Sequence, residues 1–127
     1  MLLCEKRSIG KMASRFSTFI VFAILLVPII LILPAAANAP SQVSLAYDSQ
    51  NQSLKVTTTH AIATSSHYVY KISIDKNGEQ VLTKEYKSQP GPTFAYDYPI
   101  NATKGDVFKA TAYCIIAGSK SAEITVM

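Results

Sequence analysis

Tryptophan is absent from this chain of 127 residues, and histidine and cysteine occur only twice each. From residue 40 onward there is no arginine either. Arginine supplies the planar fork that grips phosphates and guanine edges, so its absence argues against nucleic-acid binding. Cys114 is the only cysteine after the N-terminal segment, because the other one is Cys4. It therefore has no partner for an internal disulfide.

The positive charge of the chain is concentrated near its start. The formal net charge is +4, from 12 basic and 8 acidic residues. Four of the basic residues and one of the acidic residues precede residue 40, so residues 40–127 carry a net charge of only +1. This near neutrality removes the remaining argument for a nucleic-acid or anionic-surface partner.

The first 39 residues have the order of a secretory signal. Basic residues extend to Arg15, residues 19–33 are almost wholly apolar, and small residues follow in 34–39. Cleavage after Ala37 is preferred, since a cut after Ala39 would leave Pro40 next to the scissile bond.

The competing interpretation of this segment is an uncleaved membrane anchor. Residues 16–37 are long enough to cross a thinned bilayer as a helix, although Pro28 and Pro34 weaken that helix. We expect residues 1–39 to form a hydrophobic signal peptide or anchor helix. Residues 40–127 then form one exported domain, extracellular or in the cell envelope and either free or tethered to the membrane.

After Ser41 the chain alternates β-rich runs with turn residues, and no stretch sustains a helical apolar period. Asn77-Gly78 predicts a tight hairpin turn, because both residues tolerate positive φ. Seven antiparallel strands with Ala-x-Ala and a cysteine on the penultimate one resemble an immunoglobulin-like sandwich. The fold class predicted is therefore all-β. The expected strands are residues 42–47, 53–59, 68–75, 80–86, 93–99, 107–116 and 121–126.

Side chains alternate between the two faces of a strand, so parity predicts which residues enter the core. On the third expected strand the inward set is Tyr68, Tyr70, Ile72 and Ile74, with Val69 facing outward. On the sixth strand the expected inward residues are Phe108, Ala110, Ala112, Cys114 and Ile116.

His60 and His67 are the only histidines of the chain. Six residues lie between them, and all of these are small or polar except Ile62. One interpretation is a pair of solvent-exposed loop histidines. The other is a pair of metal ligands, which requires the connection to curl into a loop. Cys114 is either a small buried core side chain, half of a disulfide to another protein, or the third ligand of a His-His-Cys set typical of transition metals.

The segment from His60 to Val69 and the later Cys114-Ile-Ile-Ala-Gly118 resemble the ferrous-iron-binding domain of the desulfoferrodoxin and superoxide reductase family. The family pattern is His-Pro, a few residues, His-Tyr-Ile, and later Cys-x-x-His-Gly. The resemblance implies an immunoglobulin-like sandwich, an iron cofactor, and the reduction of superoxide. It makes His60 and His67 equatorial iron ligands and Cys114 the axial ligand.

The chain departs from the family pattern at its ligands. The family holds iron with four imidazoles and one thiolate, whereas Ala117 occupies one histidine position, Ala61 replaces the proline, and no histidine precedes His60. We therefore expect an altered metal site, with iron as the first candidate and copper as the second. The alternative is a metal-free extracellular binding or cell-envelope module. A hydrolase has little support, since no histidine lies near a suitable nucleophile and carboxylate, and we predict no catalytic residues.

Overall fold

The computed structural model describes residues 35–127. Each of the seven predicted strands is confirmed, with ends within two residues of those expected. Residues 1–34 of the expected signal or anchor helix fall outside the described residues, and the expected domain boundary after residue 39 stays a prediction. A short 3-10 turn, η2 (Ala35–Asn38), precedes the strands β1 (Gln42–Asp48), β2 (Ser53–Thr59), β3 (Val69–Lys76), β4 (Glu79–Glu85), β5 (Thr93–Pro99), β6 (Val107–Cys114) and β7 (Ser119–Thr125).

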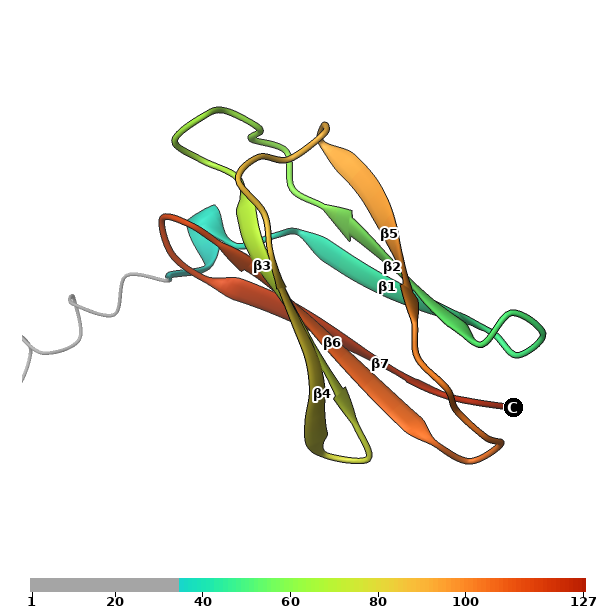
Figure 1. Cartoon of the computed structure of the whole chain (residues 1–127). Helices are drawn as coiled ribbons and strands as arrows, with labels where there is room; N and C mark the ends of the chain where they lie inside the picture. The colour runs from blue at the N-terminus through green and yellow to red at the C-terminus, as the bar shows by residue number, and fades with distance from the viewer. Residues whose placement is uncertain (1–34) are drawn as a thin grey trace, which may run out of the picture. The chain divides into compact units, whose positions relative to one another are not determined.

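The strands form two antiparallel sheets, one with the order β1-β2-β5 and one with the order β4-β3-β6-β7 (Figure 1). This arrangement confirms the all-β sandwich. In residues 35–127 no helix is both long and apolar enough to span a membrane.

The hydrophobic core lies between the two sheets. Most of its side chains come from alternate positions of β2, β3 and β6, as strand geometry requires, and β1 and β5 add Val43, Phe94 and Tyr98. Burying each large aliphatic or aromatic side chain stabilises the fold by about 1.5–3 kcal/mol. The largest side chains with no exposed surface are Leu54, Val56, Ile72, Ile74 and Phe108.

The turn between β3 and β4 explains why β4 belongs to the larger sheet. Asn77 and Gly78 both have positive φ, 54° and 83°, as predicted for a two-residue hairpin. Lys76 pairs directly with Glu79 across this turn. So short a connection returns the chain beside β3, and β4 cannot cross to the other sheet.

Predictions about inward-facing residues were wrong in two places. Val69 is 1% exposed, whereas Tyr68 and Tyr70 are only half-buried, because the pairing of β3 with β6 shifts between Val69 and Lys71. A bulge of this kind inserts one residue and reverses the alternation before it. Ile116 is 54% exposed, because β6 ends at Cys114 and the chain turns away from the core.

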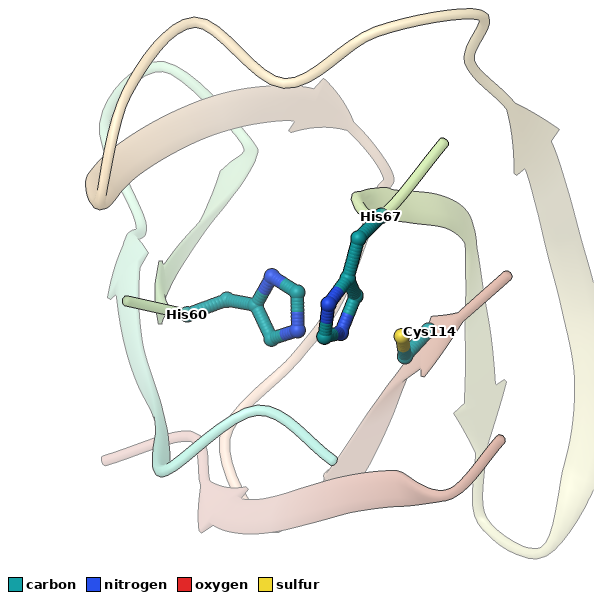
Figure 2. Close-up of side chains that lie close together, drawn as sticks. All are labelled: His60, His67 and Cys114. Atoms are coloured by element: carbon teal, nitrogen blue, oxygen red, sulfur yellow. The ribbon is translucent and has the colours of Figure 1, made fainter. Parts of the chain in front are cut away.

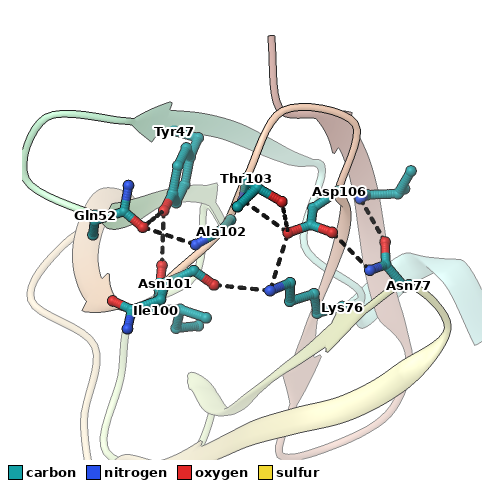
Figure 3. A network of polar contacts seen from close by, with 10 residues as sticks. Tyr47, Gln52, Lys76, Asn77, Ile100, Asn101, Ala102, Thr103 and Asp106 are labelled. Carbon is teal, nitrogen blue, oxygen red and sulfur yellow. Dashed lines mark hydrogen bonds and ion pairs between the residues drawn. The ribbon is translucent and has the colours of Figure 1, made fainter.

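A polar network joins the β3–β4 turn to the loop between β5 and β6 (Figure 3). The carboxylate of Asp106 accepts hydrogen bonds from the Asn77 amide at 2.8 Å and the Thr103 backbone N–H at 2.9 Å. It also lies 3.0 Å from the ammonium of Lys76. The network fixes the end of the sandwich opposite the histidines.

Candidate metal centre

His60 enters the sandwich because it continues the inward face of β2. Leu54, Val56 and Thr58 are all buried on this face, and His60 has the same parity just beyond the strand's last residue, Thr59. Its backbone N–H donates to the carbonyl of Pro92 at 2.7 Å, which holds the strand end in place. The side chain is 3% exposed.

His67 reaches the same region because the connection from β2 to β3 folds back on itself. Thr64 and His67 exchange two backbone hydrogen bonds, of 2.9 and 3.3 Å, which close the end of this connection. His67 stands two residues before the buried Val69 and is 7% exposed. The interpretation of both histidines as solvent-exposed loop residues is therefore wrong.

Cys114 is the last residue of β6 and faces inward. It follows Phe108, Ala110 and Ala112 on the buried side of this strand, and it pairs with Val69 at the start of β3. Its side chain is 4% exposed, and within residues 35–127 its thiol forms no disulfide. Burial agrees with an inert core thiol as well as with a ligand, so the neighbours of the sulfur decide between them.

The three side chains lie together at one end of the sandwich. One donor atom from each of His60, His67 and Cys114 lies within 4.8 Å of the others. The two rings meet edge to face with their centroids 4.9 Å apart. Figure 2 shows the His60 ring pointing at the His67 ring, with the Cys114 sulfur beyond it. The structure thus brings together all three residues that the sequence singled out.

The donor set fits a transition-metal ion. Nε2 of His67 is buried and has no hydrogen-bond partner, which is costly unless something binds it. Two imidazoles and a thiolate are ligands that zinc, copper and iron accept. Bonds of about 2.0–2.3 Å would require the most distant donors to close by roughly 1 Å, which small side-chain rotations provide.

The four-imidazole iron centre of the superoxide reductase family, which the sequence resembles, does not fit this chain. The sequence holds only two histidines, and both already belong to the cluster. Ala117, at the position of a family ligand, has no donor atom in its side chain. A metal held by this cluster would have two imidazoles and one thiolate, with further ligands from the backbone, from water or from a bound molecule.

A cavity of about 700 Å³ opens onto the two rings. His60 and His67 line it, together with Pro40 before β1 and Gly118 before β7. Cys114 does not line it. A small ligand in the cavity would therefore contact the histidines of the cluster and not the sulfur.

Two residues at the site were missed by the sequence analysis. The side chain of Gln89 lies 2.9 Å from Nδ1 of His60, and the backbone carbonyl of Asn38 lies 3.1 Å from Nε2. Gln89 stands in a loop of turn residues and Asn38 in the expected signal region, so no local pattern indicated contact with His60. The one available signal was that Gln89 carries a side-chain amide among neighbours that are typical turn residues.

Fold and site together define a β-sandwich with a buried His-His-Cys cluster. No protein-family model matches the sequence, and no curated protein matches it. Among solved structures, a superoxide reductase (neelaredoxin) variant from Ignicoccus hospitalis is similar, with a TM-score of 0.49 and 13% identity over 72% of this chain and 82% of that chain. A superoxide reductase in the oxidized state has a TM-score of 0.46 and 17% identity, over 72% of this chain and 98% of that chain. These likenesses are distant and concern the fold alone.

Proposed function

We propose that this domain binds one transition-metal ion through His60, His67 and Cys114. The observation that carries the proposal is their convergence within 4.8 Å at a buried point, although they come from three separate strand ends. The unpartnered Nε2 of His67 supports it further. The ion would replace the missing partner and hold β2, β3 and β6 together at this end of the sandwich.

Metal analysis of the purified full chain tests the proposal. Wild-type protein, loaded in turn with Fe²⁺, Cu⁺ and Zn²⁺ without oxygen, should retain about one ion per chain of at least one metal. His67→Ala and Cys114→Ser should each lose most of it. Thr58→Val is the matched control, because Thr58 is equally buried on the same face as His60 and its hydroxyl has no partner. Equal metal content in wild type and His67→Ala would refute the proposal and leave a metal-free module.

Iron is the first metal we propose, because His67-Tyr68-Val69 and Cys114 with Gly118 resemble the His-Tyr-Ile and Cys-x-x-His-Gly segments of the superoxide reductase family. Copper is the second, since two histidines and one cysteine also make copper sites on β-sandwiches. A redox role toward superoxide rests on the resemblance alone. It predicts that the iron-loaded protein consumes superoxide faster than His67→Ala does, and equal rates would remove this role without affecting metal binding.

We also propose that residues 1–39 export the domain, as a cleaved signal or as a membrane anchor. The support is the order of basic, apolar and small residues in the sequence. Mass spectrometry of protein recovered outside the cytoplasm should give a chain starting at Asn38 if the signal is cleaved. An intact chain in the membrane fraction would indicate the anchor, and an intact chain in the cytoplasm would refute export.

A further inference from the structure

The side chain of Gln89 is held in one orientation by backbone groups. Its Nε2 lies 2.8 Å from the carbonyl oxygen of His60 and 2.6 Å from that of Gly91. Carbonyl oxygens only accept hydrogen bonds, so this end must be the NH₂ group. The other end, Oε1, accepts from the backbone N–H of Val69 at 3.1 Å. Three backbone contacts therefore decide which end of the amide faces His60.

This orientation favours one position for the proton of His60. Nδ1 of His60 lies 2.9 Å from Oε1 of Gln89. An amide oxygen cannot donate, so this contact is a hydrogen bond only when Nδ1 carries the hydrogen. A neutral imidazole has a single N–H, which leaves a lone pair on Nε2. Nε2 is also the nitrogen that points toward His67 in Figure 2.

The surroundings of Nε2 favour a cation at that position. The carbonyl oxygen of Asn38 lies 3.1 Å away, so two lone pairs face each other when the ring is neutral and protonated on Nδ1. The two contacts thus make opposite demands on a neutral ring, and the one with Gln89 is the shorter, at 2.9 Å against 3.1 Å. A metal ion bound to Nε2 would remove the repulsion, and the thiolate of Cys114 would offset one unit of its charge.

We propose that Gln89 is a positioning residue that fixes the Nδ1–H tautomer of His60 and so presents Nε2 as the metal-binding nitrogen. The metal part of this inference rests on the proposed function, whereas the tautomer is a property of the metal-free protein. Metal-ligating histidines usually donate their other ring N–H to an acceptor, and loss of that acceptor typically weakens metal binding about 10- to 100-fold.

Nitrogen NMR of the metal-free full chain tests the tautomer directly. Long-range ¹H–¹⁵N spectra should show His60 protonated on Nδ1 in the wild type. Gln89→Leu, which lacks the acceptor, should shift His60 toward the Nε2–H form, whose proton can donate to Asn38. A wild-type ring protonated on Nε2, or a tautomer unchanged by Gln89→Leu, would overturn the inference.

Measurements of metal affinity distinguish two roles of Gln89, orienting the His60 ring and stabilising the loops. Gln89→Glu keeps an acceptor for Nδ1 and for Val69 but loses the two bonds to the carbonyls of His60 and Gly91. It should therefore lower the Tm while leaving the affinity for Zn²⁺ within about threefold of wild type, whereas Gln89→Leu lowers both the Tm and, by about 10- to 100-fold, the affinity. Equal losses of affinity in the two variants would mean that Gln89 only supports the loops.

Gln80→Leu is the control for the change in side-chain type, because Gln80 is exposed on β4. It should leave both the tautomer of His60 and the affinity for Zn²⁺ unchanged. A wild-type protein that shows the Nδ1–H tautomer but binds no metal would refute the proposed function, while the control of the ring by Gln89 would stand.

Discussion

The ammonium of Lys76 lies 3.0 Å from the carboxylate of Asp106 and also donates to the carbonyl of Asn101 at 2.9 Å. The three residues tie the end of β3 to the loop between β5 and β6. This loop connects the two sheets, because β5 belongs to the smaller sheet and β6 to the larger one. Asp106 is only 17% exposed, so its hydrogen bonds compete little with water. This contact closes one end of the sandwich, as the histidine cluster does at the other.

Asp106→Asn should lower the stability at neutral pH. The hydrogen bond from Asn77, followed by those from the Thr103 backbone and Lys76, holds the pKa of Asp106 well below its usual range. A depressed pKa means that the stabilisation is present above the usual carboxyl pKa of about 4 and is lost as pH falls through the lower folded-state pKa. Urea unfolding should therefore show a gap between wild type and variant at pH 7 that narrows toward pH 2. Asp97→Asn is the control, because the Lys55–Asp97 pair is long, at 3.9 Å, and exposed, and it should change stability little.

The hydroxyl groups of Tyr86 and Tyr98 lie 2.6 Å apart. Tyr98 is 6% exposed, so Tyr86→Phe leaves a buried hydroxyl without its partner and should cost about 1–3 kcal/mol. The double variant with Tyr98→Phe removes both hydroxyls and should cost less than the sum of the single changes. Chemical denaturation of the four proteins measures this coupling. Additive losses would show that the hydrogen bond contributes nothing.

The same pair should make the protein sensitive to alkaline pH. Burial, followed by the hydrogen bond to Tyr86, raises the pKa of Tyr98 above its usual value of about 10. A raised pKa leaves the stability unaffected below pH 10 and reduces it as pH rises toward the folded-state pKa. The free energy of unfolding of wild type should thus fall more steeply between pH 10 and 11.5 than that of Tyr98→Phe. Parallel curves would contradict this assignment.

Two glycines form a matched test of the turn between β3 and β4. A methyl group at either Gly78 or Gly91 would meet nothing within 4 Å, so neither substitution creates a clash. Gly78 has a φ of +83°, whereas Gly91 has no such strained angle. Gly78→Ala should therefore cost about 1–2 kcal/mol, and Gly91→Ala should be neutral or slightly stabilising. Equal Tm values for the two variants would show that the turn does not require glycine.

The thiol of Cys114 should react slowly in the folded protein, because it is 4% exposed and does not line the cavity. In a Cys4→Ser background, labelling with an aromatic disulfide should be at least about 100-fold slower than in urea, since reaction requires local opening. Loading with Zn²⁺ should slow it further. Labelling as fast as in urea would show that the sulfur is open to solvent.

Local residue patterns determined the strands of this protein. Alternation along each run, and the positive φ tolerated by Asn77 and Gly78, depend only on near neighbours. For the same reason the sequence predicted all seven strands and most of the core. It failed at Val69, where the bulge depends on how β3 pairs with β6, and at Ile116, where the strand ends early.

For the candidate site, too, the sequence indicated some features and only the folded structure decided the others. Residue chemistry together with the family resemblance singled out His60, His67 and Cys114, because they are the only histidines of the chain and the only cysteine after residue 40. Their burial and meeting point depend on three strand ends packing together from two sheets. The contacts of His60 with Gln89 and Asn38 join residues 29 and 22 positions apart, and nothing in the local sequence encodes them. Only the folded chain decides which nitrogen of His60 faces the cluster, because that choice depends on the backbone groups that orient Gln89.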